Sequence, residues 1–265
     1  MLRRRLRIAL VALLAAMAAA SAPGARARQA DPEALVAAAS DLQFAFPELA
    51  AAFAAEGRGR VRAVFGSTGN FARQLRQGAP YELFMAADES FVRALARDGV
   101  LPDEGAPYAE GRLALLVRRG GPLAADGALE DLAAALREGR VRRFAIANPE
   151  HAPYGMRARD ALRAAGLWEA LQPVLVMGEN VAQAAQFVAS GAAQGGVAAL
   201  SLAMSPRIAR QVDHAPIPPH MHPPLIQRMA LTRRAGPAAR AFFAFVRSER
   251  GRRILAAHGF APPAD

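Results

Sequence analysis

Four short segments combine small or hydroxylated residues with the expected start of a helix, and this chemistry suits an anion. The backbone N–H groups of a first helical turn have no partner within the helix and carry partial positive charge, so they can hold an oxyanion together with hydroxyl donors. Each segment alone could be an ordinary helix cap, because Ser, Thr, Asp and Asn are preferred there. The four together favour an anion site. The segments are Ser40-Asp41, Ser67-Thr68-Gly69-Asn70, Pro153-Tyr154-Gly155 and Glu179-Asn180-Val181.

The elements that would position these segments alternate between short apolar strands and amphipathic helices. This alternation predicts an α/β fold with mostly parallel sheets. The chain is expected to leave a first lobe near residue 111 and to return near 224, with a ligand in the cleft between two lobes. A proline-rich extended connector is expected at 214–224. Strands are expected at 33–40, 60–65, 81–87, 111–121 and 225–232, helices at 41–57, 70–78, 88–99 and 236–260, and both kinds of element within 142–166 and 173–203.

The N-terminus has the order of a secretory signal peptide. Residues 1–7 hold four arginines, residues 8–20 are an unbroken apolar run, and small residues follow. The apolar run is shorter than the ~20 residues that a membrane-spanning helix needs, so we expect a cleaved leader rather than an anchor. The leader should cover residues 1–30, with cleavage between 22 and 30. The mature chain is then expected to be a soluble periplasmic protein.

Charge and composition exclude several functional classes. The chain has 265 residues and a net charge of +10, but residues 1–30 contain six arginines and no acid, which leaves 27 basic against 23 acidic residues, a net charge of +4. The arginines are scattered among acids and no cluster of aromatic residues accompanies them, so we expect no nucleic-acid partner. The chain has no cysteine, and therefore no disulfide and no thiolate metal site.

The hydroxyl-rich segments lack the partners that catalysis would need. The turn at 66–70, "GSTGN", has no lysine of a nucleotide P-loop, the chain has no G-x-S-x-G motif, and Ser40 has no evident His/Asp relay. We expect no enzyme activity and no cofactor, with a periplasmic enzyme as an alternative. His214, His220 and His222, with Asp213, could ligate a metal, but a surface connector is the better account of this segment.

Five segments together resemble the molybdate-binding proteins of ABC importers, in order and over nearly the whole mature chain. The resemblance implies a two-lobed type II periplasmic-binding-protein fold, with residues 31–111 and 225–265 in lobe 1 and residues 112–224 in lobe 2. Each lobe would hold a mixed, mostly parallel sheet flanked by helices. The resemblance also implies a monomer that binds molybdate or tungstate between the lobes and delivers it to a permease in the inner membrane. The segments are "AAAS" (37–40), "GSTGNFARQLRQGAPYELFMAADES" (66–90), "ANPEHAPYG" (147–155), "GENVAQAAQFVASGAAQGGVAALS" (178–201) and "RGRRILAAHGF" (250–260).

The same resemblance assigns contacts with the oxyanion to particular residues. Ser40 would contribute its hydroxyl and its backbone N–H, and Thr68 and Tyr154 would contribute hydroxyl groups. The backbone N–H groups of Ala87 and Val181 would complete the set.

Ala199, Ser67 and Asn180 also bear on this assignment. The family places its tyrosine either in an "APYG" loop, as here, or after the late glycine-rich strand, where this chain has Ala199. The tyrosine is therefore present in one of its two family positions. Ser67 and Asn180 adjoin the assigned residues and are further candidates.

Asp41 departs from what a dianion requires, because a carboxylate beside Ser40 would repel it. Part of the family has an asparagine here that contributes to binding, so Asp41 is counted with the oxyanion-binding residues. Either its side chain turns away and interacts with its own helix start, or it accepts a proton-bearing oxygen and favours a protonated oxyanion. The alternatives to molybdate are therefore phosphate, arsenate or sulfate. A regulator's effector domain is a further alternative, against which the leader argues.

Overall fold

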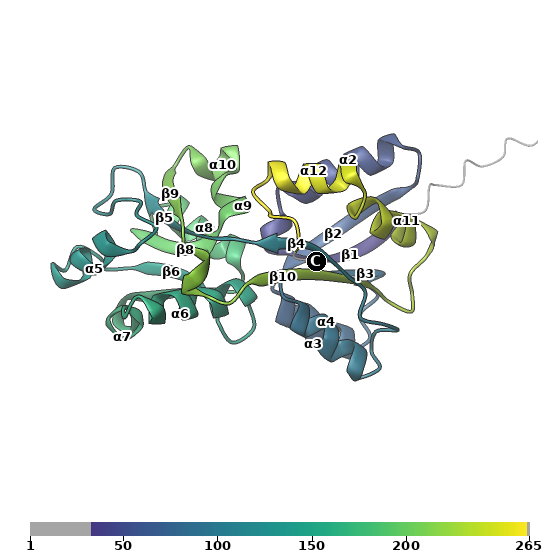
Figure 1. The fold of residues 1–265 in the computed structure, drawn as a ribbon, viewed down its shortest axis with the longest axis horizontal. Helices are drawn as coiled ribbons and strands as arrows, with labels where there is room; N and C mark the ends of the chain where they lie inside the picture. The colour runs from purple at the N-terminus through teal and green to yellow at the C-terminus, as the bar shows by residue number, and fades with distance from the viewer. Residues whose placement is uncertain (1–32, 264–265) are drawn as a thin grey trace, which may run out of the picture. The chain divides into compact units, whose positions relative to one another are not determined.

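Two mixed β-sheets of five strands each form the framework of residues 33–263, the part of the chain that this computed structural model describes (Figure 1). The expected signal peptide, residues 1–30, lies outside the described residues. The strands are short runs rich in small and apolar residues, and helices pack on both faces of each sheet. Burial on both faces explains why the inner strands β3 (Leu83–Ala86), β5 (Leu113–Arg118), β6 (Phe144–Ala147) and β8 (Gly195–Ala199) are continuous apolar runs, whereas the edge strand β2 (Arg60–Gly66) alternates. The predicted α/β fold class is confirmed.

Sheet A contains the first described strand. Its members are β1 (Glu33–Ala39), β2 (Arg60–Gly66), β3 (Leu83–Ala86), β4 (Ala106–Gly111) and β10 (Leu225–Leu231). They lie in the order β2-β1-β3-β10-β4. β1 is parallel to β2 and β3, and β10 runs antiparallel to β3 and β4. The register pairs Ala39 with Gly66, so β1 and β2 end side by side.

Sheet B repeats this plan with different strands. Its members are β5 (Leu113–Arg118), β6 (Phe144–Ala147), β7 (Leu175–Gly178), β8 (Gly195–Ala199) and β9 (Val212–Pro216). They lie in the order β7-β6-β8-β5-β9. β6 is parallel to β7 and β8, whereas β5 runs antiparallel to β8 and β9. One strand in each sheet, β10 or β5, therefore opposes the direction of the other four.

Helices cover both faces of sheet A (Figure 1). Those on one face are α2 (Ala45–Ala55), α11 (Pro237–Val246) and α12 (Glu249–Ala257). Those on the other face are α3 (Thr68–Arg76) and α4 (Glu89–Arg97). Phe53 and Phe242 meet edge to face, with ring centroids 5.2 Å apart, in the core between α2 and α11. This aromatic packing fixes the helices from the two ends of the chain on one face.

Sheet B is covered mainly by α6 (Pro153–Ala164) and α8 (Val181–Ala189). The shorter helices around it are α5 (Glu130–Arg137), α7 (Trp168–Leu171), α9 (Leu200–Ala203), α10 (Pro206–Ala209), and the single turns η3 (Gln172–Val174) and η4 (Pro219–Met221). None of the helices in residues 33–263 is long and apolar enough to span a membrane.

The chain passes between the two sheets twice, at Arg112 after β4 and over residues 217–224 before β10. We call sheet A with its helices lobe 1 and sheet B with its helices lobe 2. The lobe boundaries expected from the sequence lie at these crossings. Their status as domain limits stays a prediction, because the described residues form one compact unit.

Local structure differs from expectation in three segments. A 3₁₀ turn, η2 (Ser40–Leu42), precedes α2 where one helix was expected over 41–57, and Pro47 lies in the first turn of α2, where proline is tolerated. The stretch 236–260 is two helices, because Ser248 caps α12 by accepting a hydrogen bond from its backbone. The expected connector at 214–224 begins as β9 and contains η4.

Several elements were not expected from the sequence, among them β4, α5, α7 and α10. β4, with the sequence "APYAEG", includes a proline and a glycine, which weaken a strand pattern. It is held in sheet A by antiparallel pairing with β10, a partner more than a hundred residues away. Tertiary pairing thus overrides a weak local signal.

Candidate functional site

A small buried pocket lies where η2, α3, α6 and α8 begin, at the carboxyl ends of strands from both sheets. The space enclosed between its lining residues is only about 10 Å³. Seven of the eight residues expected at the oxyanion line this pocket, and Asn180 does not. The seven are Ser40, Asp41, Ser67, Thr68, Ala87, Tyr154 and Val181. The lining residues are Ala39, Ser40, Asp41, Gly66, Ser67, Thr68, Ala87, Ala152, Pro153, Tyr154 and Val181.

Ser40 connects η2 to the start of α8. Its Oγ accepts a hydrogen bond from the N–H of Ala182 at 3.3 Å, which does not use the hydroxyl proton. The N–H of Val181, the first residue of α8, has no acceptor within the helix because of its terminal position. The Asn180 side chain caps the same helix, accepting from the N–H of Gln183 at 3.1 Å. The start of α8 therefore presents the backbone N–H of Val181 to the pocket, while the side chain of Asn180 bonds to the helix itself.

Thr68 has the same arrangement on α3. Its Oγ1 accepts from the N–H of Ala87 at 3.0 Å, again without using the hydroxyl proton. In this structure the N–H of Ala87, which is expected to donate to the oxyanion, donates to Thr68. Ser67 caps α3, with its Oγ 3.4 Å from the N–H of Asn70 and 2.9 Å from Nδ1 of His151.

Asp41 is buried in the pocket wall, with 1% of its surface exposed. Its Oδ2 accepts hydrogen bonds from the hydroxyl of Tyr154 at 3.1 Å and from Nε2 of Gln227. Its Oδ1 has no hydrogen-bond partner among the described residues. The side chain therefore contacts residues of two other elements, Tyr154 on α6 and Gln227 on β10. Tyr154, expected to donate to the oxyanion, donates its proton to Asp41.

Burial determines the protonation of this group. It raises the pKa of Asp41 from the ordinary 3.8 to about 6, although the hydrogen bonds from Gln227 and Tyr154 and the nearby backbone of η2 act to lower it. Burial and the nearby Asp41 charge both raise the pKa of Tyr154 and that of Tyr108 on β4. Asp41 therefore titrates close to neutral pH while both phenols keep their protons.

Sequence reasoning missed two polar side chains that contact residues of the pocket lining, Gln227 and His151. Gln227 is fully buried in β10 and binds both Asp41 and Tyr154. The available signal was an uncharged polar residue inside the apolar strand "LIQRMAL". His151 precedes the start of α6 and meets Ser67 from the other lobe. Its signal was only its place in "ANPEHAPYG", a segment otherwise noted for its tyrosine.

Gly69, in the first turn of α3, contacts the backbone of the other lobe. Its N–H donates to the backbone oxygen of His151 at 2.9 Å. A Cβ at this position would lie 2.6 Å from that same oxygen. Glycine is therefore required here for the backbones of the two lobes to meet.

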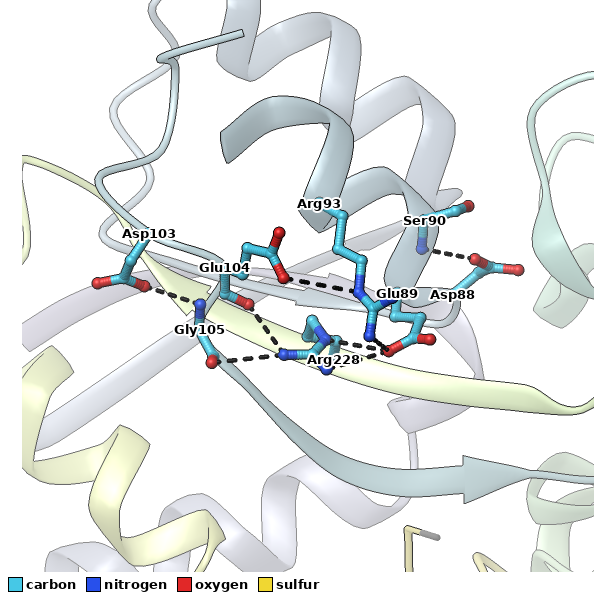
Figure 2. Close-up of polar contacts among 8 residues, drawn as sticks. All are labelled: Asp88, Glu89, Ser90, Arg93, Asp103, Glu104, Gly105 and Arg228. Carbon is cyan, nitrogen blue, oxygen red and sulfur yellow. Dashed lines mark hydrogen bonds and ion pairs between the residues drawn. The ribbon is translucent and has the colours of Figure 1, made fainter. Parts of the chain in front are cut away.

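An ion pair beside the pocket also joins the lobes. Arg157 on α6 contacts Asp88 at 3.0 Å, and the two side chains are only 20% and 8% exposed. Figure 2 shows Asp88 at the start of α4, where its Oδ1 also accepts from the backbone of the first turn at 2.8 Å. The adjacent Glu89 pairs with Arg93 and Arg228 inside lobe 1. Of these contacts, the pair of Arg157 and Asp88 is the one that crosses between lobes.

Within residues 33–263, no group of three or more His, Cys, Asp or Glu residues could hold a metal ion. His214 lies in β9, whereas His220 lies in the turn η4 and His222 follows it. Nδ1 of His222 is 2.8 Å from the backbone oxygen of Pro223. The turn η4 thus interrupts the extended connector that was expected at 214–224.

Comparison with known proteins identifies the family. A family model described as bacterial extracellular solute-binding protein matches residues 34–261. The chain is 32% identical to the molybdate-binding protein ModA of Azotobacter vinelandii over 86% of this chain and 89% of that protein, and 29% identical to ModA of Rhodobacter capsulatus over 86% and 88%. The solved periplasmic molybdate-binding protein of Azotobacter vinelandii matches with a TM-score of 0.76 at 28% identity, covering 87% of this chain and all of that one. The chain is therefore a binding protein rather than an enzyme, and it belongs to the family of bacterial extracellular solute-binding proteins.

Proposed function

We propose that this protein is the solute-binding component of an ABC importer and that it binds molybdate or tungstate in the pocket between its lobes. Two relatives that match most of its length are named as molybdate-binding proteins. The observation that carries the proposal is the pocket itself, where four helix starts and the hydroxyls of Ser40 and Thr68 share one small buried space.

The pocket offers an oxyanion neutral donors rather than a cation. The oxygens of Ser40 and Thr68 each accept a backbone N–H bond, so their hydroxyl groups are oriented and their protons remain for an acceptor. The N–H groups at the starts of α3 and α8 add partial positive charge. The lining contains no arginine. A tetrahedral dianion would thus be held by hydrogen bonds, and Ala87 would act by orienting Thr68.

The fixed donors also provide discrimination by size. Their positions are set by helix starts that are packed against two sheets, so they cannot follow a smaller ion. A smaller tetrahedron such as sulfate would leave some donors without an acceptor, which is costly in a buried site. Molybdate and tungstate, which are larger and similar to each other, would satisfy the same donors.

Residues 31–111 with 225–265, and residues 112–224, would act as the two domains of this binding protein. Donors from both lobes grip one anion, so the anion favours the closed arrangement, and a permease in the inner membrane would recognise it. The protein would work in the periplasm as a monomer, after removal of the leader over residues 1–30.

Another tetrahedral oxyanion is the second candidate, and the position of Asp41 in the pocket wall is the observation that favours it. An ionised carboxylate there could accept a hydrogen bond from a protonated oxygen. Phosphate and arsenate carry such an oxygen near neutral pH, which would make Asp41 a selective acceptor.

Isothermal titration calorimetry of residues 31–265 against molybdate, tungstate, phosphate and sulfate tests this proposal. We expect molybdate and tungstate to bind with Kd values far below 10 μM, and sulfate and phosphate to bind much more weakly. Weaker binding of both expected anions than about 10 μM, which corresponds to only about −7 kcal/mol, would contradict the proposal. Tight phosphate binding that Asp41→Asn abolishes would support the second candidate instead.

A further inference from the structure

The side chains of Asp41, Tyr154 and Gln227 form a buried group in and behind the pocket wall, which we call the carboxyl cluster. Asp41 Oδ2 accepts from the other two residues, and Gln227 Nε2 lies 3.3 Å from the Tyr154 hydroxyl oxygen. Two acceptors in the cluster, Asp41 Oδ1 and Gln227 Oε1, are buried and have no hydrogen-bond partner among the described residues. Buried acceptors without donors are uncommon, because each has lost its bonds to water. The carboxyl cluster therefore contains more hydrogen-bond acceptors than donors.

From this shortage, and from the place of Asp41 in the pocket wall, we infer that Asp41 takes up one proton when the protein binds its oxyanion, and that the neutral carboxyl supplies a further hydrogen-bond donor to the anion. The inference rests on the proposed function, because it concerns the same pocket. It makes Asp41 a determinant of how binding depends on pH.

An ionised Asp41 would oppose a dianion in two ways. Tyrosine has one hydroxyl proton, and Tyr154 donates it to Asp41 Oδ2, so none is left for the anion. The carboxylate also places a negative charge beside the anion in a buried site, where water does little to screen the repulsion. Charge and donor geometry therefore act in the same direction.

A neutral Asp41 removes both obstacles, wherever its proton lies. With the proton on Oδ2, Asp41 donates to the Tyr154 oxygen, and the Tyr154 hydroxyl is free to donate to the anion. With the proton on Oδ1, Asp41 itself can donate to the anion while Oδ2 still accepts from Tyr154 and Gln227. Either arrangement gives the pocket one more donor and one negative charge fewer.

The groups around Asp41 allow this proton uptake near neutral pH. Its own element, η2, packs against α8, α9 and β2; α8 and α9 have no titratable side chain, and Arg60 and Arg62 lie in the amino-terminal half of β2, away from the pocket. The titratable groups that face Asp41 from α6 and β4 are the phenols Tyr154 and Tyr108, and β10 contributes the uncharged Gln227. Because none of the residues within 33–263 places a cation against the carboxyl, burial alone raises its pKa to about 6.

Calorimetry of the unmodified chain with molybdate measures both the pH dependence of the affinity and the uptake of a proton. Above the pKa of Asp41 the affinity should fall tenfold per pH unit, so the Kd should be about 50-fold weaker at pH 8 than at pH 6. Titrations at pH 8 in buffers of different ionisation enthalpy should show the uptake of about one proton per anion, falling to about half a proton at pH 6. These measurements need no variant and do not depend on how any substitution folds.

Asp41→Asn is the matched variant, because an asparagine keeps the shape and always carries an N–H donor. We expect it to bind molybdate with an affinity that stays constant from pH 6 to pH 8 and with no proton uptake. Tight binding by the unmodified chain with constant affinity and no proton exchange would overturn the inference and leave the proposed function intact. No molybdate or tungstate binding at any pH would overturn the proposed function itself. Tight phosphate binding that is lost in Asp41→Asn would show that the ionised carboxyl accepts a proton from the ligand, and would also overturn the inference.

Discussion

The two sides of the pocket are built on opposite principles. On one side, which we call the donor side, the hydroxyl oxygens of Ser40 and Thr68 each accept a backbone N–H bond and leave their protons unused. On the other side, the carboxyl cluster holds a buried acid and two acceptors without donors. The hydroxyl groups of the donor side are oriented before an anion binds, whereas the acceptors of the carboxyl cluster gain a donor only when Asp41 takes up a proton.

Because of this difference, the binding affinity and its dependence on pH arise in separate parts of the pocket. Donors that are already oriented lose little entropy on binding, so the donor side can supply most of the binding free energy. The carboxyl cluster instead carries an unfavourable term, since an ionised group is buried without a cation. A binding site of this kind keeps its selectivity for anions in one region and its response to pH in another. Four experiments with substituted proteins test this division, in order of decreasing expected effect.

The largest effect is expected for Asp41→Asn on the stability of the protein without ligand. The pKa of Asp41 is raised in the folded protein, from 3.8 to about 6, so the folded state holds the proton more tightly than the unfolded state. Stability should therefore fall as the pH rises from about 4 to about 6 and stay low above that range, by a total of about 3 kcal/mol for this group. Urea unfolding of both proteins at pH 4.5 and pH 7.5 measures the difference.

Asp41→Asn lacks this titration, so its free energy of unfolding should exceed that of the unmodified chain at pH 7.5 and not at pH 4.5. Other acids titrate in the same range in both proteins, and the comparison cancels them. An equal loss of stability with rising pH in both proteins would show that Asp41 is not the group responsible.

The second effect concerns the contact that brings the donor side against lobe 2. In Gly69→Ala the new Cβ would lie 2.6 Å from the backbone oxygen of His151, so the lobes could not close fully around an anion. We expect the Kd for molybdate to weaken by about 100-fold, in line with the ~1–3 kcal/mol typical of overpacked contacts. Thermal unfolding without ligand should be unchanged or slightly raised, because alanine favours the helix. Unchanged affinity would mean that binding does not require this approach of the lobes.

The third effect isolates a single donor. Thr68→Val keeps the side-chain shape and removes the hydroxyl, and hydrogen bonds to charged groups contribute about 1.5–3 kcal/mol, so the Kd should weaken by about 30-fold at every pH. Thr232→Val is the matched control, since Thr232 is also buried but donates to the backbone of Tyr81, away from the pocket. The control should lose stability without losing affinity. If both variants lose affinity equally, Thr68 does not act as a donor to the anion.

The division between the two sides also explains what the sequence could reveal. Donor-side residues were expected because helix starts and strand ends follow local patterns, and "AAAS" and "GSTGN" mark them directly. The cluster behind Asp41 depends on Gln227, which follows it by 186 residues in the chain. No local pattern records such a contact, so the partner and the direction of the Asp41 side chain could not be derived.

The same limit applies to the fold. The strands that feed the pocket were expected because their apolar runs are bounded by glycine, proline and polar residues. β4 was missed because its stability comes from pairing with β10 rather than from its own residues. The role of Gly69 could not be derived for the same reason, since its close neighbour is the backbone of His151 from the other lobe.

The smallest effect concerns an interlobe contact outside both sides of the pocket. Arg157 and Asp88 pair across the lobes with little exposure, so removing the pair should weaken the closed arrangement without changing any donor. We expect Arg157→Gln and Asp88→Asn each to weaken molybdate binding about fivefold, with a coupling energy of about 1 kcal/mol in a double-mutant cycle that shrinks at high salt. Arg93→Gln is the control, because Arg93 pairs with Glu89 inside lobe 1 (Figure 2) and should leave affinity unchanged. A coupling energy of zero would show that the pair does not contribute to closure, and the contacts at the pocket would then account for it alone.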